Sequence, residues 1–397
     1  MTARMTSTTQ FGTWTQELRL WLGECAREAG FDAAGVAEVR GPDDPAAALQ
    51  AGRYAGWVEA GHAGEMEYLK RRDEAGTLVR SALQVAMPWA RSVVVCALNY
   101  NADAPRSIDA APQGAGWIAR YAWSGRADAG GGLVPTDYHG ELLGRLRTIE
   151  TQLLARAGCE TRCYVDTGPL VERSMAAQAG VGWIGKNTCV LNRELGSWLL
   201  LGVIVTSLPV EERVAALDGV DRCGSCTRCI DACPTGALLG TKEIAGPREM
   251  DASRCIAYVT IEKKGAIEVD LREGMGRQVF GCDICQDVCP WNRKAPSGDA
   301  ENMQARRELI NPALEWLAAM DAKEFKRRFK GSPLERTGRR RLLRNVAIAM
   351  GNSGEERFLA QLDEWRAGED AVLAEAAEWA RVRILARRAG LTQTRAD

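Results

Sequence analysis

Eight of the thirteen cysteines lie between residues 223 and 289, in two runs of similar spacing. The first run is Cys223, Cys226, Cys229 and Cys233, and Pro234 follows it. This C-x2-C-x2-C-x3-C-P spacing is typical of chains that hold two 4Fe-4S clusters, because three closely spaced thiolates wrap one corner of a cube while the fourth serves the other cube. The run therefore predicts iron-sulfur chemistry.

The second run repeats this pattern with one substitution. Val279 stands where the first cysteine would fall, and the isolated Cys255 is the natural replacement. A zinc ribbon or disulfides are the alternatives, but zinc closes with four ligands and leaves no use for the C-x3-C-P crossover. We expect two ligand sets, one of Cys223, Cys226, Cys229 and Cys289 and the other of Cys233, Cys255, Cys282 and Cys285.

Two clusters conduct electrons, so the rest of the chain must hold a redox site or a partner. With 397 residues, 46% of them hydrophobic, the chain is long enough for a catalytic domain beside the clusters. The first ten residues show no apolar core or twin arginines, and the apolar stretch 198–208 is too short to span a bilayer. We expect a cytoplasmic protein with no membrane segment, in which cysteines bind metal rather than form disulfides.

Periodicity predicts a fold that mixes helices and strands before the cysteines. Helices are expected over 15–29 and 45–60, and strands over 32–39 and 91–100, with Cys96 at the centre of the second strand. That strand is apolar throughout and should be buried on both faces. The segment 101–135 is rich in glycine, alanine and proline and is too long for a simple connector.

A helix should open near Asp137, where Asp137 or Thr136 could be only its N-cap. A strand over 161–166, a helix that starts near Pro169 and ends at 179, and strands over 188–192 and 198–207 follow. The glycine-rich loop 180–187 matches neither a P-loop nor a dinucleotide-binding motif. It suits either close approach to a flat ligand or a structural turn.

The C-terminal region concentrates positive charge in a chain whose formal net charge is -1. Ten basic residues face three acidic ones between 321 and 345, which favours nucleic-acid binding about as much as a solvated helix face. Helices are expected over 311–329, 339–350, 357–365 and 371–388. The last three resemble one HEAT-type repeat, which cannot bury its own face and should pack on the cysteine region.

These motifs, in this order, resemble one family, the cobalamin-dependent epoxyqueuosine reductases of tRNA modification. The resembling segments, which span nearly the whole chain, are Gly64 to Leu69, Arg120 to Ala122, Asp137 to His139, Val165 to Pro169, Glu172-Arg173, Ala179 to Asn187, Gly196 to Trp198, both cysteine runs, and Arg344-Asn345 to Gly351-Asn352. One departure stands out. The stretch 124–136 is longer than the resemblance leads us to expect, which leaves the conformation of that loop open.

The resemblance implies a substrate and a reaction. Epoxyqueuosine at the wobble position of tRNAs with a GUN anticodon, those for aspartate, asparagine, histidine and tyrosine, would be reduced to queuosine. Electrons would pass from an external low-potential donor through two 4Fe-4S clusters to cobalamin. By the same resemblance Asp137 would protonate the leaving epoxide oxygen. We also expect the chain to act as a monomer.

The resemblance also implies three regions: a nitroreductase-like α/β (α+β) cobalamin-binding domain over 1–210, a ferredoxin-like two-cluster domain over 211–300, and a helical HEAT-like tRNA-binding region over 301–397. Residues expected near the corrin or substrate are Arg120, Tyr121, Asp137, Asp166, Trp183, Lys186, Asn187 and Cys96. The basic segment supplies the residues expected on tRNA phosphates, Arg340, Arg341 and Arg344. A reductive dehalogenase and a ferredoxin-like carrier are the alternatives. The first normally has an export signal and lacks a basic tail, and the second leaves the predicted sheet unexplained.

Overall fold

An antiparallel sheet of four strands forms the centre of the N-terminal half. The computed structural model describes residues 12–41, 43–211, 221–243 and 248–390. The strand order is β1-β2-β9-β6, and every neighbouring pair is antiparallel. The strands are β1 (Ala33–Glu38), β2 (Ser92–Asn99), β6 (Thr161–Tyr164) and β9 (Leu199–Thr206). All eight residues of β2 are buried, which confirms the strand expected over 91–100.

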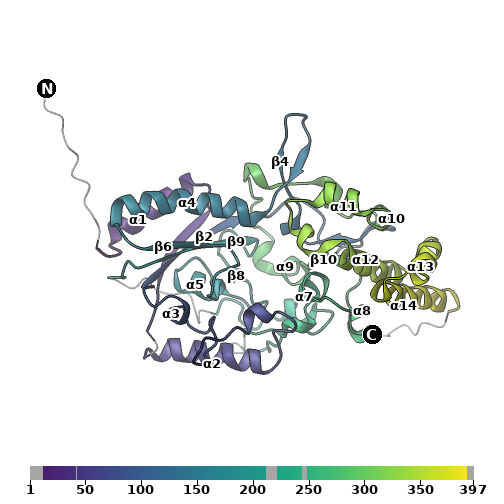
Figure 1. Ribbon diagram of the computed structural model, residues 1–397, viewed down its shortest axis with the longest axis horizontal. Helices are drawn as coiled ribbons and strands as arrows, with labels where there is room; N and C mark the ends of the chain where they lie inside the picture. Colours follow the sequence, from purple (N-terminus) through teal and green to yellow (C-terminus); the bar gives the residue numbers. More distant parts are fainter. Residues whose placement is uncertain (1–11, 42, 212–220, 244–247, 391–397) are drawn as a thin grey trace.

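Helices cover both faces of this sheet (Figure 1). The amphipathic helices α1 (Gln16–Glu28) and α4 (Tyr138–Ala157) pack their leucine stripes on one face. The short helices α3 (Leu83–Ala86) and α5 (Glu172–Gln178) cover the other face. Helix α5 begins three residues after Pro169, so that proline does not form its first turn as expected. Helix α2 (Pro45–Glu59) and the strands β7 (Trp183–Ile184) and β8 (Val190–Leu191) complete this half.

The long segment 101–135 contains three short strands. Strand β3 (Trp117–Ile118) leaves the sheet domain, and β4 (Ser124–Ala127) and β5 (Leu133–Pro135) form a hairpin that projects from the molecule (Figure 1). Asp128 closes its turn, accepting backbone bonds from two glycines. Strand β11 (Gln304–Ala305) pairs with β4. The stretch 124–136, whose conformation the sequence left open, is therefore this hairpin.

The cysteine region is built from short helices joined by irregular backbone. It contains α6 (Arg228–Asp231), α7 (Ile256–Ile261), α8 (Val269–Arg272), β10 (Gln278–Phe280) and α9 (Ile284–Asp287). Strand β10 pairs in parallel with β3, which ties this region to the sheet domain. Val279, which replaces a cysteine in the repeat, is fully buried on β10. The expected start of the region at 211 adjoins residues 212–220, which lie outside the described residues.

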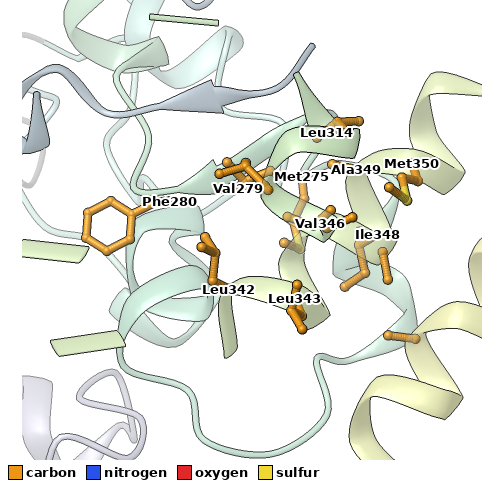
Figure 2. Packing of buried hydrophobic residues seen from close by; sticks show 14 of the residues in the cluster. Met275, Val279, Phe280, Leu314, Leu342, Leu343, Val346, Ile348, Ala349 and Met350 are labelled. Carbon is orange, nitrogen blue, oxygen red and sulfur yellow. The ribbon is translucent and has the colours of Figure 1, made fainter. Parts of the chain in front are cut away.

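The C-terminal helices share one core with the cysteine region. They are α10 (Leu314–Ala318), α11 (Ala322–Phe329), α12 (Pro333–Ser353), α13 (Leu359–Arg366) and α14 (Ala371–Arg388), so the single helix expected over 311–329 is two. Figure 2 shows Leu342 and Val346 of α12 packed near Val279 and Met275. The expected packing of this repeat on the cysteine region is confirmed, and the core does not divide at residue 300.

Helix α12 is kinked at Gly338, whose φ of 74° lies in the left-handed region that favours glycine. The turn before the kink and the turns after it therefore point their arginines in different directions. No helix in the described ranges is long and apolar enough to cross a bilayer.

Candidate active site and cluster-binding sites

Four cysteines from both runs line one cavity of about 290 Å³: Cys223, Cys226, Cys229 and Cys289. The crossover that brings Cys289 to the first run is thus present in the fold. Burial, and then charges on Cys289, Cys223 and Cys226, together raise the pKa of the Cys229 thiol to about 12. A positively charged centre would be needed to hold these sulfurs as thiolates, and iron in a cluster supplies it. Ligation by these four residues remains a prediction.

The glycine-rich loop 180–187 borders this cavity. Lys186 is 1% exposed, and its ammonium donates to the carbonyl of Gly224 at 2.7 Å, inside the first cysteine run. Trp183 packs edge-on against Trp291 at 4.9 Å between ring centres. The structure therefore sets three residues expected at the corrin, Trp183, Lys186 and Asn187, beside the first cysteine group.

Two buried donors of this loop have no protein acceptor in the described structure, Trp183 Nε1 and Asn187 Nδ2. An unsatisfied buried N–H costs free energy, so such donors are usually paired. Cluster sulfurs accept hydrogen bonds of this kind, and those bonds set reduction potentials. The donors fit a cluster in the adjoining cavity.

The other four predicted ligands gather in a second group. Burial raises the pKa of Cys282 well above its usual range, and charges on Cys255 and Cys233 act in the same direction. The pKa of Cys285 is raised by a hydrogen bond with Cys189 and by burial. Cys189 is a fifth thiol at this site, and spacing analysis missed it because it lies apart from both runs, just after the glycine-rich loop.

Arg120 links the sheet domain to the second cysteine run through hydrogen bonds and an ion pair. It is 7% exposed, its guanidinium donates to Asn101 and pairs with Asp287 at 3.4 Å, and its backbone N–H donates to Asp283 at 2.7 Å. The guanidinium also lies 4.3 Å over the ring of Trp198. Most of its donors are used within the protein, so its observed role is structural rather than the expected contact with the corrin.

Cys96 belongs to the sheet core. It is fully buried at the centre of β2, in the hydrophobic cluster that α1 and α4 cover. Burial raises the pKa of its thiol far above the usual range, which keeps it neutral. The expected contact of Cys96 with a cofactor is wrong because packed side chains surround it.

Asp137 caps helix α4, as one interpretation of the sequence held. Its carboxylate accepts from the backbone of His139 at 3.0 Å and lies 2.9 Å from His139 Nδ1. Arg336 of α12 forms an ion pair with the same carboxylate. Burial pushes the pKa of Asp137 upward, but the bonds from His139 and the charge of Arg336 outweigh it and lower the pKa. The raised pKa that a proton donor at neutral pH requires is absent from this state.

A second carboxyl site lies at the hydroxyl end of Tyr138, which follows Asp137. Tyr138 donates to Asp166, and the Asp166 backbone N–H donates to Glu172 at 2.9 Å. Asp166 has a φ of 58°, a conformation that costs energy in a non-glycine residue. Burial, and then the charge of Asp166, raise the pKa of Glu172 well above its usual range. Tyr121 contacts the Tyr138 ring edge-on at 5.8 Å.

The basic segment divides into buried and exposed arginines. Arg344 is 1% exposed and donates to the carbonyls of Val259, Lys263 and Gly265. Its expected contact with tRNA is wrong, because its donors stabilise the loop after α7. Arg341 likewise bonds backbone carbonyls, including Ile261. The exposed basic residues of α11, α12 and their junction are Lys323, Lys326, Arg327, Lys330, Arg336 and Arg340.

Comparison with known proteins agrees with this site chemistry. A family model described as a 4Fe-4S double cluster binding domain matches residues 222–292, which places the chain among the iron-sulfur proteins. The model for Epoxyqueuosine reductase QueG, DUF1730, matches residues 80–167. An epoxyqueuosine reductase from Xanthomonas campestris is 38% identical over 359 residues, 89% of this chain and 93% of the relative. The chain belongs to the epoxyqueuosine reductase family.

Solved structures of this family superpose over nearly the whole chain. One, an epoxyqueuosine reductase with an epoxyqueuosine-modified tRNA stem loop, has a TM-score of 0.76 and 30% identity and covers 93% of this chain and 90% of its own. Another, from Bacillus subtilis, has its aspartate-bearing catalytic loop swung out of the active site. It has a TM-score of 0.74 and 28% identity, with the same coverage.

Proposed function

We propose that this protein reduces epoxyqueuosine to queuosine at the wobble position of tRNAs with a GUN anticodon, and that Asp137 protonates the epoxide oxygen. The observation that carries the proposal is the pair of carboxyl sites around Tyr138, in a chain that also brings two groups of cysteines together. The solved relative with a bound tRNA stem loop supports the substrate. The catalytic aspartate loop of the Bacillus subtilis relative supports the role of Asp137.

The cofactors follow the division of the site. Cys223, Cys226, Cys229 and Cys289 would hold one cluster, and Cys233, Cys255, Cys282 and Cys285 the other. Cobalamin would lie near Tyr121 and Asp166, the residues expected at the corrin that remain close to Asp137. When bound, the clusters and cobalamin would pass on low-potential electrons that come from an external donor. We propose that the chain acts as a monomer.

The chain's own residues would hold and donate the protons that the reaction needs. Conversion of an epoxide to an alkene takes two electrons and two protons and releases water, and an acid that protonates the leaving oxygen speeds it. Asp137 is partly buried at the start of α4, whereas burial and the charge of Asp166 favour the protonated form of Glu172 at the other end of Tyr138. Asp137 can donate only after its pKa rises, which requires the loss of a cationic partner or burial by the substrate.

The test is turnover of epoxyqueuosine-containing tRNA by protein reconstituted with both clusters and cobalamin, followed by nucleoside mass spectrometry. We expect queuosine to form in one turnover under reducing conditions. An absorption titration with cobalamin tests binding separately. Full cluster content and cobalamin binding with no queuosine formed would overturn the proposed reaction.

A further inference from the structure

Arg336 joins the helical region to the start of α4. It lies two residues before the kink at Gly338, and its guanidinium pairs with Asp137, 199 residues earlier in the chain. It also lies 5.7 Å over the ring of Tyr138. Its side chain stays 45% exposed, so solvent and solutes reach the guanidinium while it holds the carboxylate.

Arg336 is also part of the exposed basic surface of α11 and α12. Lys330 precedes it and Arg340 follows it, and both are exposed. An arginine guanidinium binds a phosphate as a two-pronged fork, as it binds a carboxylate. Asp137 and an RNA phosphate would therefore compete for the same donors.

The groups that face Asp137 come from more than one element. His139 belongs to the same helix, Arg336 comes from α12, and the charge of Asp137 also reaches Tyr121 in the turn before β4. Of these, Arg336 is the permanently charged partner, and it is more exposed than either Asp137 or His139. Arg336 is therefore the partner of Asp137 that a bound polyanion can attract away from the carboxylate.

We infer that Arg336 is a positioning residue, which holds Asp137 as a capped carboxylate in the free protein and transfers to a phosphate of the RNA on binding. This inference rests on the proposed function, because it takes RNA as the ligand. Loss of the guanidinium removes the positive charge that favours the ionised form of Asp137. The carboxyl would then become a proton donor only while substrate is present.

The test is a double-mutant cycle on RNA affinity. A fluorescent, unmodified anticodon stem loop is titrated with the full-length protein, and anisotropy reports binding without turnover. Arg336→Gln should weaken binding about two- to fivefold, because one half-exposed charge contact is lost. The slope of log affinity against log salt should flatten by roughly 0.7 to 0.9. Arg336→Lys should restore much of the affinity.

The decisive variant in this cycle of affinity measurements is Asp137→Asn. The RNA no longer has to compete for Arg336 in this variant, so binding should tighten, again about two- to fivefold. In the Arg336→Gln background the same change should have no effect. Asp363→Asn, which frees Arg381 from an ion pair at 2.8 Å between α13 and α14, is the matched control and should leave affinity unchanged.

Unchanged affinity in Asp137→Asn, or equal tightening with and without Arg336, would overturn the inference. Thermal unfolding of each variant separates a folding defect from a binding effect. The proposed function fails by a different result, namely normal RNA binding and an intact cycle with no queuosine formed. The two failures are therefore distinguishable.

Discussion

The two carboxyl sites at the ends of Tyr138 have opposite electrostatic environments. Asp137 faces an arginine and a histidine, which lower its pKa. Glu172 faces Asp166, and burial together with this like charge raises its pKa. The environment of the same chemical group thus favours the ionised form at one end of the tyrosine and the protonated form at the other.

This difference teaches how acid and base roles are divided. Where environments push the pKa values of neighbouring titratable groups apart, the group with the raised pKa stores a proton and the other stays charged. We expect Glu172, the carboxyl with the raised pKa, to store a proton in the free protein, although its sequence context marked it only as part of a motif. Arg336 favours the ionised form of Asp137 while the two are paired, so on our inference the role of Asp137 depends on the substrate.

The largest expected effect is that of Asp137→Asn on turnover. Asparagine keeps the N-cap of α4 but cannot donate a proton to the epoxide oxygen, so single-turnover conversion of epoxyqueuosine tRNA should fall about a hundredfold or more. Cluster content and cobalamin binding should stay normal. Conversion close to that of the wild type would leave Asp137 as a cap and would favour the Glu172 side as the proton source.

A second prediction concerns the raised pKa of Glu172. A carboxyl that binds its proton more tightly in the folded state stabilises the fold at low pH. That stability is lost as pH rises from the unfolded value, near 4.5, through the raised folded value. Glu172→Gln should remove this loss. The difference in free energy of unfolding between this variant and the wild type should therefore increase, in favour of the variant, by up to about 1.4 kcal/mol for each pH unit over that interval.

Urea unfolding at pH 5, 6, 7 and 8 measures this difference. Glu194→Gln is the control, because Glu194 is exposed in the loop after β8. Parallel stability curves for the wild type and Glu172→Gln would show that Glu172 is ionised in the fold, and the contrast between the two carboxyl sites would disappear.

The sequence predicted regular elements well where periodicity was strong. Helix α14 has the bounds expected for it, and α1 begins after the cap Thr15 because its leucines recur at helical spacing on one face. The hairpin of β4 and β5 was missed because its glycine-rich turn carries no alternating apolar pattern. Strand β3 was missed because it is two residues long and is defined by pairing with β10.

The sequence predicted which chemical groups form the site better than it predicted where their side chains lie. The spacing of the cysteines predicted that Cys289 joins the first run, because the geometry of cluster ligands constrains that spacing within each run. The count of basic residues suggested tRNA contacts at Arg344, yet it could not show which side of α12 faces the core. Neither the Arg336–Asp137 pair nor the contact of Cys189 with Cys285 has a local signal, because each joins residues far apart in the chain.

The smallest expected effect comes from cutting the link between Tyr138 and Asp166. Burial, and then the charge of Asp166, raise the pKa of Tyr138 far above its usual range, so the hydroxyl keeps its proton and donates it in a hydrogen bond. Tyr138→Phe removes that bond but keeps the ring that contacts Tyr121 and Arg336. We expect a loss of about 1 kcal/mol in the free energy of unfolding, because water can reach the exposed Asp166.

Denaturant unfolding measures that loss, and Tyr54→Phe, which removes the hydroxyl bond to Leu69, is the matched control. In an Asp166→Asn background the effect of Tyr138→Phe should shrink, because the charged acceptor is gone. The response of stem-loop affinity to Asp137→Asn should be the same with tyrosine or phenylalanine at 138. If Tyr138→Phe also abolishes that response, the two carboxyl sites act as one coupled network, and a separate proton store at Glu172 is wrong.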